Sequence, residues 1–344
     1  MSVDAPDLPD DLLDRLVRVL APVGVPVAVE PLTGGLFGTT WRVRLADARD
    51  VVVKVTSTDP RRLLTYEHDT ARAEALVLRL GADHPDLLLP RLLHLDTSGD
   101  VLDGDVLVTA FVEGTLAEQA DLAGPDDPRA ARYSSDLGRC LARLHRVQGP
   151  AFGPVHAVHV RGGDDDPPAR RLHGATWPEA FGAMVGAALD DGVRWGVALP
   201  AADVRDALAR HHDALAHVRR PVLAHADLRP GNVLVEPASG AVVALLDPER
   251  AVWAEPLYDL VATDQDGVHD VPTGVLAGYA AQAGAAPDLD RPDAQARLWL
   301  YRLLFGLLLH VEPEPRGYEG PEADAFRHRT HTQITTSLSS LADL

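Results

Sequence analysis

Five short segments between residues 25 and 112 have the hydrophobic pattern of strands. Hydrophobic and polar side chains alternate in 41–46, and 50–57 is rich in β-branched residues. Alternation with a period of two is typical of strands that bury one face. A period near 3.6 occurs instead in residues 7–20 and 66–80, and it predicts a helix at each place. The segments that we expect to form strands are 25–32, 41–46, 50–57, 91–97 and 105–112.

Helical periodicity dominates the chain after residue 114, and it predicts helices in 134–147, 177–193, 202–218 and 293–311. Two short apolar segments, 232–236 and 241–247, flank the turn sequence PASG and predict a β-hairpin. The polar stretch 161–174, which is rich in Pro and Gly, predicts a surface loop. We therefore expect an α+β protein of two lobes. They are a β-rich lobe over 1–113, which ends in a hinge at about 109–114, and a larger helical lobe over 114–344.

Composition narrows the range of partners. The 344 residues carry 51 acidic side chains against 32 Lys and Arg side chains, a formal net charge of −19. This excess of negative charge disfavours binding to nucleic acid and to anionic membranes. The most apolar segment, 298–309, contains an arginine and is shorter than the ~18 residues of a membrane span. The first residues show no secretory signal. We expect a cytoplasmic protein whose single cysteine, Cys140, is a small core residue.

The segment AHADLRPGNVLV, residues 224–235, places a carboxylate, an amide and a turn directly before a predicted strand. A phosphoryl-transfer site needs a carboxylate that accepts a hydroxyl proton and oxygen ligands that hold Mg²⁺ against the phosphates. Asp227 can supply the first, and Asn232 can return to the same cavity after the Pro-Gly turn. The predicted hairpin then leads to Asp247 and Glu249, which would project to one side of an extended segment. This arrangement predicts an Mg²⁺ pocket.

The arrangement resembles the catalytic loop and metal loop of kinases, and its form is closer to the aminoglycoside phosphotransferase-like small-molecule kinases than to protein kinases. The resemblance rests on HADLRPGN at 225–232, DPE at 247–249 and AEPLYDL at 254–260, and in outline it covers nearly the whole chain. Asp247 and Tyr258 are only eleven positions apart, which leaves no room for a long activation segment. The resemblance implies a protein-kinase-like fold and a small-molecule acceptor with a free hydroxyl group.

Four features of the first half occur in the order that such a fold requires: a glycine-bearing turn, a strand lysine, a helix glutamate and a hinge. By the resemblance, backbone N–H groups of residues 34–39 would cover the phosphates, and Lys54 would contact them while Glu74 fixes its side chain. Thr109 would line the rear of the base pocket, and the backbone of residues 110–112 would read the base. The nucleotide-binding residues implied in this way are Gly34, Gly35, Gly38, Thr39, Lys54, Glu74, Thr109, Ala110 and Val112.

The resemblance also implies roles for the residues of the second half. Asp227 would orient the acceptor hydroxyl and accept its proton. Asn232 and Asp247 would hold Mg²⁺, and Glu249 would bind the metal directly or through water. Arg229 would either stabilise charge on the transferred phosphoryl group or lie at the surface. The phosphoryl donor would be ATP or GTP.

The resemblance implies structural roles for two residues near Asp227. The sequence also departs from the family pattern at two places. Asp259 would anchor the backbone of the catalytic loop, and His225 would be an orienting residue of that loop. Ala226 stands where the family usually has glycine, and a methyl group is tolerated there only if φ is not positive. Leu36 and Phe37 are bulky for a phosphate turn, so the choice between ATP and GTP stays open.

The acceptor pocket is expected in the helical lobe, where acids and aromatic residues follow one another. The acids could bind an amine-bearing substrate and the tryptophans could stack on a sugar or base, although each residue also fits an ordinary helix position. These residues are Trp177, Glu179, Asp190, Asp191 and Trp195.

Three functions follow from these features. The first is a kinase that inactivates a sugar-bearing antibiotic such as an aminoglycoside or a nucleoside, which agrees with a composition typical of high-GC bacteria. The second is a metabolic kinase that acts on fructosamine adducts, amino sugars, choline or homoserine. The third is a nucleotide-binding pseudokinase scaffold, which the intact set of Lys54, Asp227, Asn232 and Asp247 disfavours. The sequence does not indicate an oligomeric state.

Overall fold

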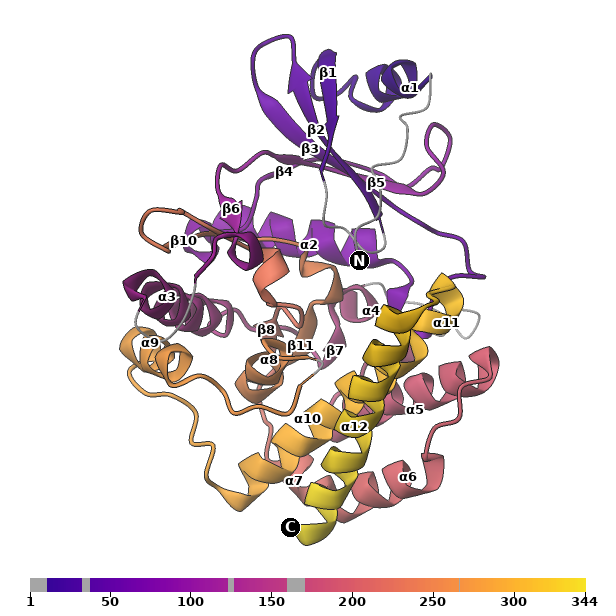
Figure 1. The fold of residues 1–344 in the computed structure, drawn as a ribbon, viewed down its shortest axis with the longest axis vertical. Helices are drawn as coiled ribbons and strands as arrows, with labels where there is room; N and C mark the ends of the chain where they lie inside the picture. Colours follow the sequence, from indigo (N-terminus) through magenta and orange to yellow (C-terminus); the bar gives the residue numbers. More distant parts are fainter. Residues whose placement is uncertain (1–10, 33–37, 123–126, 160–170, 266) are drawn as a thin grey trace.

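The computed structural model describes residues 11–32, 38–122, 127–159, 171–265 and 267–344. Its first part is a five-stranded antiparallel sheet in the order β1-β2-β3-β5-β4, and its second part is mainly helical (Figure 1). The sheet strands are β1 (Pro26–Pro31), β2 (Gly38–Leu45), β3 (Asp50–Thr56), β4 (Leu92–Asp96) and β5 (Asp105–Ala110). All five expected strands are therefore present.

Two helices cover opposite faces of this sheet. They are α1 (Leu12–Val19) and α2 (Thr70–Asp83). Because side chains alternate along a strand, Val51 and Val53 of β3 point into the core that α1 covers, and Lys54 points toward the other face. Leu78 of α2 packs with Leu107 of β5 on that second face. The predicted helix at 66–80 begins later than expected, because residues 65–67 form a short 3₁₀ turn, η1 (Thr65–Glu67).

The long helices of the second part bury one continuous core, which includes Cys140 as expected. The predicted helix at 202–218 is divided in two at His211. Helices α10 and α12 lie side by side below the sheet (Figure 1). The helices are α3 (Pro128–Leu144), α4 (Val155–His159), α5 (Trp177–Trp195), α6 (Ala201–Arg210), α7 (His212–Ala216), α8 (Pro256–Ala262), α9 (Thr273–Ala283), α10 (Pro292–Val311), α11 (Pro313–Arg316) and α12 (Pro321–Asp343).

Short strands and 3₁₀ turns form the part of the chain that faces the sheet. The predicted hairpin is present, as β9 (Val233–Val235) paired antiparallel with β10 (Val242–Leu245). The other short elements are η2 (Pro85–Leu87), β6 (Thr115–Leu116), η3 (Ala117–Gln119), β7 (Gly153–Pro154), β8 (Val222–Ala224), η5 (Pro230–Asn232), η6 (Pro248–Arg250) and β11 (Val252–Ala254). Helix α2 packs directly on η6, so the sheet part and the helical part meet at the segment that follows β10.

The architecture confirms the expected α+β fold. None of the helices in the described ranges is long and apolar enough to cross a membrane.

Candidate active site

A cavity of about 520 Å³ lies between the sheet and the short elements that face it. Residues from β3, α2, β5, the segment after β5 and the 229–249 region line it together. Arg229, which was predicted to be catalytic, is among them, and so are most of the residues that the sequence assigned to nucleotide and metal binding: Lys54, Glu74, Thr109, Ala110, Val112, Asn232, Asp247 and Glu249. The fold thus brings two halves of a predicted site to one cavity although they are nearly 200 positions apart.

The Lys54 ammonium group contacts three carboxylate groups that line this cavity. Its Nζ donates to Oε2 of Glu74 at 2.9 Å and to Oε2 of Glu249 at 2.7 Å, and it also contacts Oδ1 of Asp247. Burial alone would lower the pKa of Lys54, but the three carboxylates outweigh it and hold that pKa well above its ordinary value. Lys54 is therefore a cation at neutral pH.

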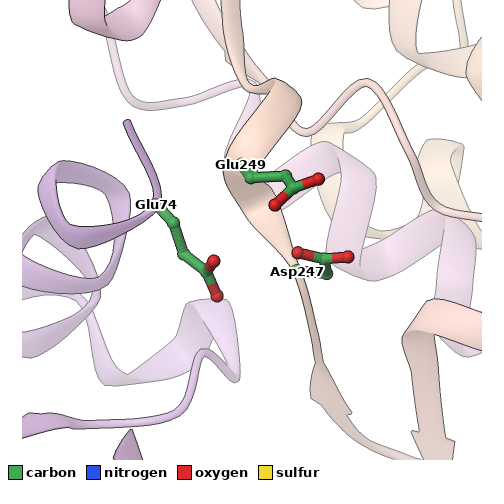
Figure 2. Close-up of side chains that lie close together, drawn as sticks. All are labelled: Glu74, Asp247 and Glu249. Atoms are coloured by element: carbon green, nitrogen blue, oxygen red, sulfur yellow. The ribbon is translucent and has the colours of Figure 1, made fainter. Parts of the chain in front are cut away.

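Glu74, Asp247 and Glu249 place carboxylate oxygens within 4.8 Å of one another. Glu74 comes from α2 and the other two from the segment after β10 (Figure 2). Burial raises the pKa of Glu74 to about 7, although Lys54 opposes the shift. Burial also raises the pKa of Glu249, whereas Lys54 outweighs burial at Asp247 and lowers its pKa. This cluster of hard oxygen donors fits a divalent cation such as Mg²⁺.

Asp247 and Glu249 converge by a different route from the one that the sequence predicted. The segment is not extended: Asp247 has a φ of 61° and a ψ of 52°, and residues 248–250 form the 3₁₀ turn η6. Aspartate tolerates this left-handed conformation better than most residues, and Pro248 favours a turn at the next position. The turn rather than a strand brings the two carboxylates to the same ammonium group.

Asp227 lies at the start of the loop that leads to η5, and its side chain is 9% exposed. Burial raises its pKa to about 6, while the nearby positive charge of Arg250 opposes that shift. Asn232 donates from Nδ2 to the backbone oxygen of Asp227 at 2.9 Å, which closes the loop on itself. Arg229 lies with Nε 3.7 Å from Oδ1 of Asp227 and is 37% exposed, so it lines the cavity while remaining open to solvent.

Asp259 anchors the catalytic loop as expected. It is fully buried, and its two oxygens accept from the backbone N–H groups of His225 at 2.9 Å and Ala226 at 2.8 Å. His225 is 1% exposed, and burial lowers its pKa, so its side chain is neutral near pH 7. The condition that the sequence analysis set for Ala226 is not met: its φ is 65°, in the left-handed region. The methyl group is thus held in a conformation that glycine would adopt without strain.

The predicted phosphate turn and hinge are only partly described. Gly34, Gly35, Leu36 and Phe37 lie outside the described residues. Gly38 and Thr39 belong to β2, where they pair with Thr56 and Val55, so at this end the predicted turn is replaced by strand. In the hinge, the N–H groups of Ala110 and Phe111 donate to backbone oxygens inside the sheet, at 2.9 and 3.2 Å. Thr109 is buried and lines the cavity, as predicted.

Two of the acceptor residues suggested by the sequence are structural. Trp177 is fully buried, and its Nε1 donates to the hydroxyl of Tyr301 at 2.8 Å. Asp191 is 2% exposed, and its oxygens accept from the backbone N–H and the hydroxyl of Thr65. Helix periodicity alone does not distinguish such core positions from a pocket. Glu179 accepts from the backbone N–H of Thr176 in a capping box at the start of α5.

The other two suggested acceptor residues lie toward the end of α5. Asp190 is exposed, and Trp195 is half-buried beneath the guanidinium group of Arg194.

The structure also reveals residues around Asp227 that the motif did not indicate. Gln265 donates from Nε2 to Oδ1 of Asp227 at 2.7 Å. Arg250 donates to Glu312 at 2.9 Å, and Arg316 bridges Glu312 to Glu67, which precedes α2. This buried network links the start of α2, the turn η6 and the region after α10.

Composition carried one signal that motif spacing did not. Lys54 is the only lysine in the chain, and every other permanently charged basic side chain is arginine. Lysine is a compact point charge, whereas the planar guanidinium group is larger and forks its donors. The single lysine thus places a compact charge at the point where three carboxylates converge.

Comparison with known proteins agrees with this geometry. Residues 28–294 match the model of the phosphotransferase enzyme family known as APH. The chain belongs to this family. The predicted resemblance is thereby confirmed, and the match spans both the sheet and the catalytic loop. A search of curated protein sequences finds no significant match.

Solved structures with the same fold align with nearly the whole length of this phosphotransferase chain. A candidate fructosamine-3-kinase from Thermobifida fusca is 20% identical, with a TM-score of 0.62 over 98% of this chain and 100% of its own. A thermostable mutant of aminoglycoside phosphotransferase APH(4)-Ia, in complex with AMP-PNP and hygromycin B, is 15% identical (TM-score 0.62, 96% and 98% covered). Macrolide 2'-phosphotransferase MphH from Brachybacterium faecium is 20% identical (TM-score 0.55, 95% and 98% covered).

Proposed function

We propose that this protein is an Mg²⁺-dependent phosphotransferase that moves the terminal phosphoryl group of ATP or GTP to a hydroxyl group of a small molecule. The observation that carries the proposal is the convergence of Lys54, Glu74, Asp247 and Glu249 on one cavity, which Arg229 and Asn232 of the loop after Asp227 also line. Membership of the phosphotransferase family agrees with it. A scaffold without catalytic activity would not require this set of charged side chains in one place.

The nucleotide would occupy the cavity with its base against the segment after β5. Because the N–H groups of Ala110 and Phe111 are used inside the sheet, the amide of Val112 is the donor that remains for the base. Thr109 would line the rear of this pocket, and Lys54 would contact the phosphates. When the nucleotide binds, the lysine would exchange some of its carboxylate contacts for phosphate oxygens.

Asp247, Glu249 and Asn232 would hold Mg²⁺. Asn232 uses Nδ2 as a donor to the catalytic loop, so its Oδ1 is the atom that can face a cation. Bound Mg²⁺ supplies neutralisation of the charge on the phosphate oxygens. Glu74, on the opposite side of the cluster, would keep Lys54 in place when Asp247 and Glu249 turn to the metal.

Asp227 would accept the proton of the acceptor hydroxyl. In the transfer, the acceptor oxygen forms a bond to the terminal phosphorus, the bond from that phosphorus to the bridging oxygen breaks, and the nucleoside diphosphate leaves with the bond's electron pair. The hydroxyl proton passes to the Asp227 carboxylate. A pKa of about 6 makes this carboxylate more basic than an ordinary aspartate while it is still ionised at neutral pH.

The acceptor that we propose is a sugar-bearing antibiotic, because the structural neighbours include kinases of hygromycin B and of macrolides. The candidate fructosamine-3-kinase among the neighbours supports an amino-sugar metabolite as the second possibility. The short segment between Asp247 and Tyr258 supports a small molecule over a protein in either case.

The experiment that tests this proposal is an acceptor screen. The purified protein is incubated with Mg²⁺ and either ATP or GTP, together with a panel of aminoglycosides, macrolides, nucleoside antibiotics and amino-sugar metabolites. Mass spectrometry then detects the addition of one phosphoryl group. A phosphorylated antibiotic supports the resistance function, and a phosphorylated metabolite replaces it with the metabolic one. Tight nucleotide binding without any phosphorylated acceptor contradicts both.

A further inference from the structure

The two carboxylate oxygens of Asp227 have different surroundings. Oδ1 accepts a hydrogen bond of 2.7 Å from Nε2 of Gln265, and Nε of Arg229 lies 3.7 Å from the same oxygen. No described residue donates a hydrogen bond to Oδ2. The carboxylate is therefore held by one oxygen, and the other is left for a ligand.

The amide of Gln265 must present its NH₂ group to this loop. Nε2 lies 2.7 Å from the backbone oxygen of Ala226 as well as 2.7 Å from Oδ1 of Asp227. Both partners are acceptors, so the amide nitrogen and not the amide oxygen has to face them. One side chain thus fixes two consecutive residues of the loop through their oxygens, while Asp259 holds the backbone N–H groups of His225 and Ala226.

Gln265 is itself held from behind by the C-terminal helix. Its backbone oxygen accepts from Nε2 of Gln333 in α12 at 2.6 Å, and the same Nε2 donates to the backbone oxygen of Arg302 in α10 at 3.0 Å. Gln265 is 7% exposed and Gln333 is 1% exposed, so water cannot readily replace either group. A buried chain of hydrogen bonds runs from α12 through Gln265 to Asp227.

We propose that Gln265 is a positioning residue for phosphoryl transfer: it holds Oδ1 of Asp227 so that Oδ2 faces the acceptor hydroxyl and takes its proton. The inference rests on the proposed function of Asp227 as the base. Rotation of the carboxylate about its bond to Cβ would move the accepting oxygen, and a misplacement of about 1 Å can reduce a rate by about 10²-fold. The hydrogen bond from Nε2 of Gln265 to Oδ1 restricts that rotation, and the bond from the same Nε2 to the backbone oxygen of Ala226 holds the amide in place.

The test compares Gln265→Met, which keeps the length of the side chain without its donors, with the wild type and with Gln282→Met. Gln282 lies on α9 and contacts Arg143, far along the chain from the catalytic loop, so its variant controls for the substitution itself. With an acceptor found in the screen, we expect kcat of Gln265→Met to fall about 10²-fold. The nucleotide KM should stay within about twofold, and the thermal midpoint should show that the protein is folded. Gln265→Asn provides a second variant, whose shorter amide cannot reach both acceptors.

A second readout separates this inference from the proposed function. Crystal structures of the wild type and of the Gln265 variant with Mg²⁺ and AMP-PNP are compared for the orientation of the Asp227 carboxylate. A rotated or disordered carboxylate in the variant supports the inference, even if no acceptor in the panel is phosphorylated and the proposed function fails. An unmoved carboxylate overturns it, as does a kcat that falls only in proportion to the loss of folded protein.

Discussion

The ammonium group of Lys54 lies 2.7 Å from the carboxylate of Glu249, although the two residues are 195 positions apart in the chain. This contact joins the sheet to the turn after β10 and places one positive charge among three carboxylates. The lysine thus has a structural role in the protein without nucleotide, in addition to the phosphate contact that we propose for it.

Lys54→Met should lower the free energy of unfolding by about 3 kcal/mol at neutral pH, because the three buried carboxylates lose their cation. Millimolar Mg²⁺ should restore part of this loss, since a divalent cation can replace the ammonium group. Urea unfolding with and without Mg²⁺ measures both effects. The matched variant Lys54→Arg keeps the charge and should lose much less stability. Equal stability of the Met and Arg variants would contradict the role of the charge.

Ala226→Gly should stabilise the protein by about 1 kcal/mol, because an alanine with a φ of 65° is strained and glycine is not. The control is Ala224→Gly, two residues earlier in strand β8, where the added freedom of glycine should cost about 1 kcal/mol. Thermal unfolding of the two variants should therefore shift in opposite directions. Destabilisation by both would show that the left-handed conformation of Ala226 carries no strain.

Asp227→Asn should make the protein more stable above pH 6. The pKa of Asp227 is raised from 3.8 to about 6 in the folded state, so the wild type loses stability as pH rises through that window. The neutral amide does not titrate, and its advantage should approach about 3 kcal/mol at pH 8 and shrink toward pH 4. Urea unfolding at the two pH values without Mg²⁺ measures the difference.

Asp213→Asn, at an exposed position of α7, is the control for the exchange of aspartate for asparagine itself. An advantage of Asp227→Asn that is the same at both pH values would contradict the raised pKa.

An acyl-phosphate derivative of ATP, which transfers its acyl group to an amine near the phosphates, should label Lys54. Because the chain has no other lysine, the N-terminal amine is the one competing group, and peptide mass spectrometry distinguishes the two. Excess ATP should protect Lys54 and leave the N-terminus unaffected. Labelling of Lys54 that ATP does not reduce would place the nucleotide elsewhere.

Much of the site could be predicted because its parts follow local rules. Local patterns indicate a lysine in a strand, a glutamate on the next helix and the run from Asp227 to Asn232. The kinase-like order of these motifs along the chain predicts that they meet at one site. The convergence of Lys54, Glu74 and Asp247 could therefore be predicted from the order of these motifs along the chain alone.

The remaining contacts could not be predicted, because they join positions without a shared spacing. Gln265 reaches Asp227 over 38 residues, and Arg316 reaches Glu67 over 249. Helix periodicity places Trp177 on the apolar face of its helix, but it does not indicate whether that face lines a pocket or packs in the core. The φ of Ala226 depends on the two anchors at Asp259 and Gln265, which only the folded chain brings together.

The central claim is that Asp227 accepts the proton during phosphoryl transfer, and the most direct measurement is a single-turnover comparison of the wild type with Asp227→Asn. Enzyme in excess over Mg²⁺-ATP and an acceptor from the screen is quenched over time, and the phosphorylated acceptor is quantified by mass spectrometry. The asparagine variant should bind nucleotide with unchanged affinity and transfer the phosphoryl group about 10²–10⁴-fold more slowly. Transfer at the wild-type rate would contradict the account.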